Sequence, residues 1–427
     1  MRAATAIGYV RFHAIFHDEV GVYDEDPQGA AVYNWSYVDQ IYDGLLESGV
    51  RPFVELSFMP RKLAASAEPH PFWYKPLPSP PISYTKWEQL VYSFARHLVD
   101  RYGVDEVRRW YFEVWNEPNI DFWTGRPNQP TYFELYDHAA RAIKRVDGGL
   151  RVGGPATAQA AWVDATIAHA VQNNVPLDFV STHVYGNDSS EDVFGTHEHI
   201  SRRDMVGKAA RKVYEQVKAS ARPDLPIHWT EYNASYKNEV GVTDSAFMGP
   251  WLAKNIRVCD GLSSTMSYWT FSDVFEEQGV VKSPFYGGYG LIAEGGVPKP
   301  AFNAFAMLHR LGDRRSQPEL ADALVTKRAD GTLVLAVWNY APPSESGAAH
   351  RVNIVVKGWR SPHYQVEIVD PEHGSALGSW RAMGSPHFPS RKQYEQLRQK
   401  AGATLKLSAP SFILQAHSLA LVEIRPQ

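Results

Sequence analysis

Two glutamates, Glu117 and Glu231, each end a short and largely apolar segment of the sequence. The first lies in Tyr111–Asn119, where Asn116 precedes it and a proline follows it, and the second lies in Ile227–Asn233. Such apolar runs are typical of parallel strands buried on both faces, and the carboxyl ends of these strands form the active face of an α/β barrel. Two carboxylates on one rim suit the hydrolysis of a glycosidic bond, in which one protonates the departing oxygen and the other attacks or stabilises the anomeric carbon.

The segments around these glutamates alternate short strands with longer helices up to about residue 312. Repeated βα units of this size predict a doubly wound sheet or a (β/α)₈ barrel, and we expect an α/β fold with a TIM-type barrel over residues 1–312. Capping-box spacing at Thr85–Glu88 and at Thr131–Glu134 predicts two helix starts, and Gly103 predicts a helix end. The expected strands are Val10–Ile15, Pro52–Phe58, Arg109–Trp115, Leu150–Gly153, Asp178–Tyr185, Ile227–Glu231 and Thr265–Thr270.

Residues 313–427 show a different pattern. The dipeptide Asp330-Gly331 separates two apolar runs and predicts a tight β-hairpin. Further short runs are typical of antiparallel strands, and Ser390–Lys400 predicts a helical insertion. We therefore expect a C-terminal antiparallel β-sandwich domain over residues 313–427.

The composition argues against several classes of protein. The chain has 427 residues, with 43 Lys and Arg against 47 Asp and Glu and no basic block, which argues against a nucleic-acid partner. No apolar run approaches the length of a membrane span, so no membrane partner is expected. The single cysteine, Cys259, excludes an intramolecular disulfide and fits a reducing compartment such as the cytoplasm. The triplet His197-Glu-His199 lacks the histidine spacing of a zinc helix and is expected to be a solvated loop.

The two glutamate motifs, Trp115–Asn119 and Thr230–Ser235, resemble the signatures of the large clan of retaining (β/α)₈ glycosidases. Bacterial members of one family of this clan, glycoside hydrolase family 39, are chiefly β-xylosidases, and its animal relatives include α-L-iduronidase. The chain is similar to that family from about Gly8 to Ile424, and the segments that carry the resemblance further are Tyr9–Asp18, Ser181–Tyr185 and Ser272–Gly279. The resemblance implies a retaining exo-glycosidase without metal or cofactor, and within the family we expect a β-xylosidase that releases xylose from the non-reducing ends of small xylo-oligosaccharides.

The resemblance also implies roles for particular residues. Glu117 would be the general acid/base, Glu231 the nucleophile, and Asn116 would bind the sugar 2-hydroxyl. Retention requires the two carboxyl groups to lie about 5–5.5 Å apart. Glu117 must hold a proton near neutral pH, so we expect its surroundings to raise its pKa. Glu231 must be ionised, with Tyr185 and His183 as candidate donors of hydrogen bonds to it, although a histidine in a strand can also be a satisfied core residue.

Five further residues are candidates for the sugar pocket. Trp269 is the expected platform beneath the sugar, and core packing is the alternative role for this side chain. Glu277, or in second place Glu276, is expected to bind hydroxyl groups of the non-reducing sugar. His13 on the first strand and Phe58 after the second are weaker candidates for the same pocket.

The strand count departs from the clan in one respect. In the clan the acid/base ends the fourth barrel strand and the nucleophile the seventh, whereas we place Glu117 on the third and Glu231 on the sixth. The offset predicts that the chain begins at the family's second strand and lacks the first βα unit, which would leave two ladder edges open. Two alternatives therefore stay open. One is another family activity (β-glucosidase, α-L-arabinosidase or α-L-iduronidase-like), and the other is a carbohydrate-binding remnant whose shortened barrel no longer catalyses. The sequence leaves the oligomeric state undetermined.

Overall fold

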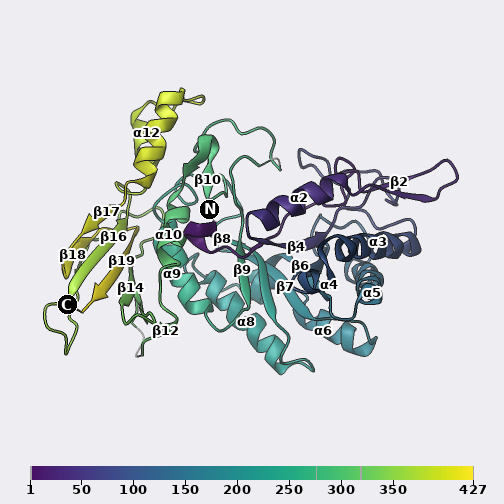
Figure 1. The fold of residues 1–427 in the computed structure, drawn as a ribbon, viewed down its shortest axis with the longest axis horizontal. Coiled ribbons are helices and arrows are strands. Elements are labelled where there is room, and N and C mark those ends of the chain that lie inside the picture. Colours follow the sequence, from purple (N-terminus) through teal and green to yellow (C-terminus); the bar gives the residue numbers. More distant parts are fainter. Residues whose placement is uncertain (1, 276, 318–319, 427) are drawn as a thin grey trace.

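Each segment predicted as a strand before residue 312 contributes to one parallel sheet, although the first is a strand at Tyr9–Val10 only and not over the predicted Val10–Ile15. In a computed structural model, which describes residues 2–275, 277–317 and 320–426, this sheet has seven strands joined in chain order (Figure 1). The five central strands are short and almost entirely buried, as expected for strands covered on both faces, whereas the residues of the two outer strands are only partly buried. The seven strands are β1 (Tyr9–Val10), β4 (Arg51–Leu56), β5 (Tyr111–Val114), β6 (Arg151–Thr157), β7 (Phe179–Tyr185), β8 (Ile227–Asn233) and β9 (Thr265–Tyr268). The arrangement is that of a TIM-type α/β barrel, and Glu117 follows its third described strand while Glu231 lies in the sixth, as predicted.

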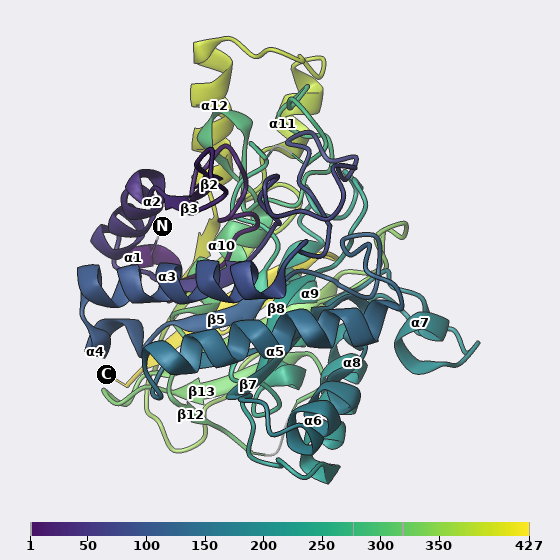
Figure 2. The ribbon, with the colours of Figure 1, turned by 90° about the vertical axis from the view of Figure 1, so that its right-hand side faces the viewer.

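Helices cover the outside of this sheet. α3 and α5 lie side by side across β5 (Figure 2), and α1 packs against α10, which brings the first described residues beside the last helix around the barrel. The helices are α1 (Arg2–Thr5), α2 (Ser36–Glu47), α3 (Tyr84–Tyr102), α4 (Val104–Val107), α5 (Asn128–Val146), α6 (Val163–Gln172), α7 (Ser190–Phe194), α8 (Met205–Ala219), α9 (Met248–Cys259) and α10 (Pro300–Leu308).

Two helix starts differ from the prediction. α3 begins directly after Ser83, whose hydroxyl accepts a hydrogen bond from the Lys86 N–H, so Thr85 lies inside the first turn. α5 begins after Pro127, and the hydroxyl of Thr131 donates back to the Pro127 carbonyl at 2.7 Å instead of capping the helix. In both cases an earlier residue provides the start, because a serine oxygen satisfies the free N–H groups and a proline has no N–H to satisfy. The predicted end of α3 at Gly103 is confirmed, with a φ of 83°.

Side chains that face the barrel axis are arranged in layers. The layer nearest the strand starts consists of four rings from four strands, which are Phe53, Tyr111, Phe179 and His228. Their centroids lie 4.5–5.6 Å apart, so they close this end of the barrel. Because side chains alternate along a strand, Glu55 and Glu113 face the axis in the next layer, shielded from water by the rings below.

The residues after 312 form two antiparallel sheets. The larger consists of β12 (Arg314–Arg315), β13 (Ala323–Lys327), β14 (Leu333–Asn339), β19 (Ser418–Arg425), β16 (His363–Val369) and β17 (Leu405–Leu407), and the smaller pairs β15 (His350–Asn353) with β18 (Ser411–Leu414). One face of the larger sheet packs on α9 and α10 and joins the barrel core, to which Val334 and Trp338 belong. Leu335, between them, belongs instead to a cluster with Phe412 of the smaller sheet. Both faces of the larger sheet therefore carry buried side chains at β14.

Smaller elements complete the chain. The predicted helical insertion is confirmed as α12 (Arg391–Gly402), which projects away from the sheets with α11 (Leu377–Ala382) before it in the chain (Figure 1). Two short hairpins pair β2 (Tyr23–Glu25) with β3 (Ala31–Tyr33) and β10 (Ile292–Ala293) with β11 (Val297–Pro298), and short 3₁₀ turns lie at Ala158–Ala160 and Glu294–Gly296. None of the helices in the described parts of the chain combines the length and the apolar character that a membrane span requires.

Candidate active site

Glu117 is positioned by an unusual turn at the end of β5. Trp115 and Glu117 both have positive φ, 73° and 45°, a conformation that side chains with a Cβ seldom adopt. The turn is held in place because the Glu117 N–H donates to the Ala156 carbonyl at 2.8 Å and the fully buried Trp115 indole donates to the Phe122 carbonyl at 2.7 Å. The chain is thereby turned so that the Glu117 carboxylate reaches His183 on β7.

Glu231 is positioned by a bulge in β8. Where β7 pairs with β8, Thr182 lies opposite Trp229 and His183 lies opposite Glu231, so Thr230 has no partner position. A bulge of this kind allows successive side chains to face the same side of a sheet. The hydroxyl of Thr230 contacts Glu113 inside the barrel, and the carboxylate of Glu231 contacts Arg11 there.

The two carboxylates come together where these strands end. One oxygen of Glu117 and one of Glu231 lie within 4.8 Å of each other, and His183 Nδ1 lies within the same distance of both. Both side chains are largely buried. Retaining glycosidases hold their carboxyls about 5–5.5 Å apart, whereas inverting ones need about 6.5–9.5 Å to admit a water. The predicted proximity is confirmed, and the spacing suits direct attack by one carboxylate on a sugar carbon.

Glu231 accepts hydrogen bonds from two donors. Arg11 Nη1 donates to one of its oxygens at 2.8 Å and the Tyr185 hydroxyl donates to the other at 2.6 Å. The predicted contact with Tyr185 is confirmed. The predicted donor role of His183 is wrong, because its Nδ1 lies 3.7 Å from Glu231 and 2.9 Å from Glu117. A guanidinium and a phenol thus hold the Glu231 carboxylate by charge-assisted hydrogen bonds, one to each oxygen.

Glu117 has the opposite environment. Burial is the main cause that raises its pKa to about 7, although the positive charges of His13 and Arg11 work against the rise. His183 is also fully buried, and burial lowers its pKa to about 4, so its imidazole is neutral at physiological pH. The expectation of a raised pKa at Glu117 is thus confirmed. Two carboxyls with such different surroundings can serve as an acid and an anion in one site.

Arg11 is the centre of a buried charge network that the sequence analysis missed. Its guanidinium forms salt bridges with Glu55 at 2.8 Å, Glu113 at 2.5 Å and Glu231 at 2.8 Å, and it donates to Asn116 Oδ1 at 2.9 Å. These three carboxylates raise the pKa of Arg11 above its usual value although burial alone would lower it. A signal was present, because a charged residue inside an apolar strand, as Glu55 and Glu113 are, is rare unless it is paired.

The remaining candidates lie around the carboxylates to different extents. His13 Nδ1 lies 2.7 Å from Glu55, and its Nε2 lies 3.5 Å from Glu277 and 3.6 Å from Glu231. The ring of Trp269 lies 4.6 Å from the His13 ring, centroid to centroid, and is almost fully buried. The structure brings these side chains together as one wall.

Two candidates stand apart from that wall. Phe58 is completely buried, packs edge-on against the Trp115 ring and lies 6.2 Å from the His13 ring, so it lies behind the wall. Glu276 lies outside the described residues.

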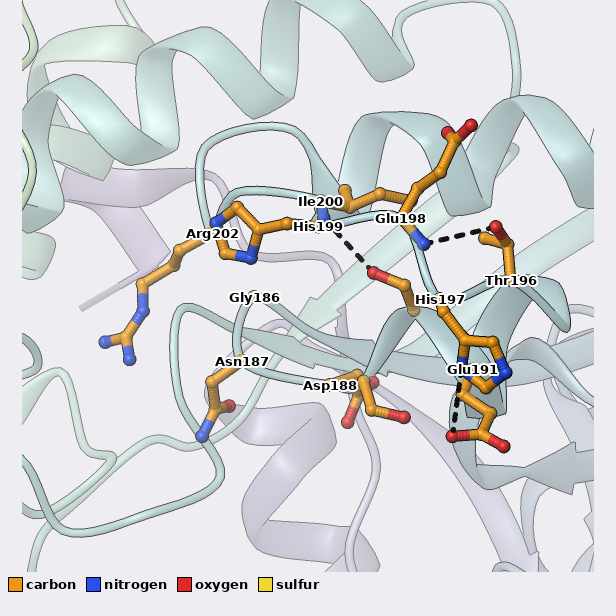
Figure 3. A pocket seen from close by; sticks show the side chains of 12 residues that line it. Gly186, Asn187, Asp188, Glu191, Thr196, His197, Glu198, His199, Ile200 and Arg202 are labelled. Atoms are coloured by element: carbon orange, nitrogen blue, oxygen red, sulfur yellow. Dashed lines mark hydrogen bonds and ion pairs between the residues drawn. The ribbon is translucent and has the colours of Figure 1, made fainter.

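A pocket of about 490 Å³ lies beside this site, in the loops between β7 and α8 (Figure 3). It is lined by residues between Gly186 and Arg202, and the carboxylate of Asp188 accepts a hydrogen bond from the Tyr185 N–H at its edge. His197 lies in its lining with a largely exposed side chain, as expected for a solvated loop. None of the described candidates lines this pocket, so the pocket does not contain the two carboxylates.

The spacing of Glu117, His183 and Glu231 by itself would also admit a metal ion. Their contacts assign these atoms other partners. Arg11 already places a positive charge at Glu231, and Nδ1 of His183 is engaged with Glu117. The arrangement therefore suits a neutral ligand on which positive charge develops, as it does on the ring of a sugar during glycoside cleavage.

Comparison with known proteins gives a consistent result. The model of the glycosyl hydrolases family 39 matches residues 1–412. A β-xylosidase of Geobacillus stearothermophilus is 36% identical over 436 residues, which cover 97% of this chain and 86% of the relative. A β-xylosidase of Caldicellulosiruptor saccharolyticus is 37% identical over 398 residues, which cover 91% of this chain and 80% of the relative.

Solved structures give the same picture. The crystal structure of a monomeric β-xylosidase from Caulobacter crescentus CB15 superposes with a TM-score of 0.89 and 34% identity, covering all of this chain and 91% of that one. The family 39 enzyme from Xanthomonas axonopodis pv. citri superposes with a TM-score of 0.88 and 34% identity, covering all of this chain and 89% of that one.

Proposed function

The chain belongs to family 39 of the glycosyl hydrolases, and we propose that it is a retaining, exo-acting β-xylosidase that releases xylose from the non-reducing ends of xylo-oligosaccharides. The observation that carries this proposal is the pair of carboxylates within 4.8 Å of each other, one with a raised pKa and the other held by an arginine. The choice of xylose as the released sugar rests on two relatives that are named β-xylosidase and are 36% and 37% identical over most of the chain.

The first step of the mechanism forms a covalent intermediate. A carboxylate oxygen of Glu231 attacks the anomeric carbon as the bond from that carbon to the glycosidic oxygen breaks, and Glu117 gives its proton to the departing oxygen. Arg11 and Tyr185 hold the attacking carboxylate in place through one hydrogen bond to each of its oxygens. The leaving group departs as a neutral alcohol.

The second step releases the sugar. Glu117, now a carboxylate, takes a proton from a water that attacks the anomeric carbon, and the ester bond to Glu231 breaks. Both residues return to their starting protonation states. Two inversions at the same carbon give net retention of the β configuration.

We assign the sugar contacts to Asn116 and to the wall of side chains beside the carboxylates, which includes His13, Trp269 and Glu277. Asn116 would bind the 2-hydroxyl and Glu277, with Glu276 in second place, the hydroxyls farther from the scissile bond. Trp269 would form the platform. The contact of His13 with Glu55 and its position beside Glu277 support a role in orienting hydroxyl binding. The burial of Phe58 supports a role in backing this wall without touching the sugar.

We further infer that the seven described barrel strands correspond to strands two to eight of the clan's pattern, because this register places the two glutamates on its fourth and seventh strands. We also infer that residues 1–312 form the catalytic barrel and that residues 313–427 form a β-sandwich accessory domain. The apolar cluster shared by the larger C-terminal sheet and the β15–β18 pair supports the sandwich.

A panel of aryl glycosides, with the anomer of the first product followed by NMR, tests activity, sugar and stereochemistry together. We expect turnover of the aryl β-D-xyloside with β-xylose as the first product. Preferred turnover of a glucoside, arabinoside or iduronide would assign another activity of the family. Binding of xylo-oligosaccharides without turnover of any substrate would indicate the carbohydrate-binding remnant, which the close carboxylate pair disfavours.

Azide separates the roles of the two glutamates. In Glu117→Ala, the covalent intermediate still forms on Glu231 from an activated substrate, and azide should attack it from the opposite face to give β-xylosyl azide. In Glu231→Ala, azide can replace the missing nucleophile directly and should give α-xylosyl azide. The reverse pattern of products would exchange the two roles.

A further inference from the structure

A series of hydrogen-bonded, buried polar side chains lies beneath the two carboxylates. It consists of Glu113, Thr230 and His183, and the two-step mechanism above gives these three residues no role. Glu113, Thr230 and His183 are all essentially inaccessible to solvent. Burying a charged or polar group is costly unless every hydrogen bond it can make is satisfied. The directions of the hydrogen bonds in this series therefore carry information about where its protons lie.

Arg11 fixes which groups in this series donate hydrogen bonds and which accept them. Glu113 is a salt-bridge partner of Arg11 at 2.5 Å, so it is a carboxylate that can only accept hydrogen bonds. The Thr230 hydroxyl lies 2.7 Å from the other oxygen of Glu113 and must donate to it. A threonine hydroxyl has one proton, so toward any other partner the Thr230 oxygen is an acceptor.

The next group in the series is His183. Its Nε2 lies 3.1 Å from the Thr230 oxygen, which can only accept there, so Nε2 must carry a proton. Burial lowers the pKa of His183 to about 4, so the ring is neutral and has one N–H only. Nδ1 is therefore an unprotonated acceptor, and it faces a Glu117 oxygen at 2.9 Å. A close contact between these two atoms requires a proton on Glu117.

We propose that Thr230 and Glu113 are positioning residues, which hold His183 in its Nε2–H tautomer so that Nδ1 accepts the acid proton of Glu117. The inference rests on the proposed role of Glu117 as general acid. We call Glu113, Thr230 and His183 the relay. The bulge in β8 makes this arrangement possible, because it turns Thr230 toward Glu113 while its neighbour Glu231 faces the sugar site. When substrate fills the site, the same O–H turns from Nδ1 to the glycosidic oxygen.

The alternative tautomer would have the opposite effect. With the proton on Nδ1, His183 would donate to Glu117 and stabilise its carboxylate form, which would lower the pKa of the acid. The relay therefore sets the pH at which the acid loses its proton, and not only the position of a ring.

The substitution Thr230→Val tests this, because valine has the shape of threonine without the hydroxyl. Nε2–H then loses its acceptor, and the ring gains by moving its proton to Nδ1. We expect the basic limb of kcat/KM for an alkyl β-xyloside to move to lower pH by about one pH unit. Thr230→Ser keeps the hydroxyl and should restore the limb.

Thr182→Val is the matched control. Thr182 is equally buried and neighbours His183 in the chain, but its hydroxyl donates to the Thr157 carbonyl at 2.9 Å, away from the carboxylates. The change removes the same atom outside the relay and should leave the limb in place. Neither substitution removes a charged or titratable group around Glu117. These groups are Arg11, His13, Glu55, Asp121, His183, Tyr185, Asp188, Glu231 and Glu277.

A second measurement observes the tautomer directly. In ¹⁵N-labelled protein at neutral pH, the imidazole signals of His183, assigned by their loss in His183→Asn, should show a protonated Nε2 in the native chain and a protonated Nδ1 in Thr230→Val. If the valine variant does not fold, Glu113→Gln serves instead. Its amide N–H would donate to the Thr230 oxygen, so the Thr230 hydroxyl would donate to Nε2 of His183 and the proton of the ring would move to Nδ1. A protonated Nδ1 in the native chain, or a limb that falls in height without moving in Thr230→Val, would overturn the relay. Failure of the proposed function would give a different result. In the native enzyme, kcat/KM would then show no fall at high pH that depends on the leaving group of the substrate.

Discussion

The protonation of Glu117 predicts how the pH dependence of the enzyme changes with the leaving group. Burial raises the pKa of Glu117 to about 7, so roughly nine-tenths of the free enzyme carries the acid proton at about pH 6 and roughly one-tenth at about pH 8. An alkoxide leaves poorly without that proton, whereas 2,4-dinitrophenolate leaves without help. We expect kcat/KM for an alkyl β-xyloside, divided by kcat/KM for the dinitrophenyl β-xyloside, to fall about tenfold over this range.

The ratio is informative because other groups titrate nearby. Burial raises the pKa of Glu277 to about 8. For His13, burial opposes the charge, but Glu55 and Glu231 outweigh it and raise the pKa to about 9. Both groups belong to the proposed sugar contacts, which the two substrates share, so their titration cancels in the ratio. The quotient kcat/KM also excludes the second step, in which Glu117 acts as a base.

The assay needs initial rates for both substrates at constant ionic strength, with circular dichroism at each pH to show that the fold is intact. Glu117→Gln, which cannot titrate, is the control. It should lose about 10²–10⁴-fold on the alkyl substrate, keep most of its kcat/KM on the activated one and give a ratio independent of pH. A ratio that stays constant in the native chain between about pH 6 and about pH 8 would refute the assignment of the acid to a Glu117 with a raised pKa.

Three further predictions concern groups that support the site. Arg11→Met leaves three buried carboxylates without their cation, so it should abolish turnover and lower the free energy of unfolding in urea by about 3–5 kcal/mol, and a near-native value would mean that these charges are satisfied elsewhere. Lys299 lies fully buried between two aspartates at 2.6 and 2.9 Å, which in turn accept backbone N–H groups from the loop that follows β9. Lys299→Met should therefore raise KM for xylosides more than it lowers kcat and cost about 3–5 kcal/mol in urea unfolding, whereas an unchanged KM would show that this loop does not need the pair. Ser83→Ala should lower the free energy of unfolding by about 1 kcal/mol because it removes the cap of α3, whereas Thr85→Ala in the exposed first turn should lower it by less than about 0.5 kcal/mol. A larger loss in Thr85→Ala than in Ser83→Ala would show that Thr85 caps the helix, as predicted from the sequence.

The parts of the fold predicted correctly are those written in local patterns. Apolar runs ending in Glu117 and Glu231 identified two barrel strands, because a strand buried on both faces needs apolar side chains along its whole length. Helix starts were less predictable. Ser83 and Pro127 compete with nearby residues of similar capping ability, and the choice between them depends on how the preceding loop approaches the helix.

The sequence by itself indicated the class of chemistry and the two glutamates that we propose as the reacting pair, because the acidic residues and their flanking motifs are contiguous in the chain. Only the tertiary structure decided which donor serves which carboxylate. Arg11 reaches Glu231 from 220 positions away, and Nδ1 of His183 lies 2.9 Å from Glu117 although the bulge at Thr230 places His183 opposite Glu231 in the register of β7 and β8. A shift of one residue turns a side chain to the other face of a sheet, and no local pattern in this sequence reveals where that shift occurs.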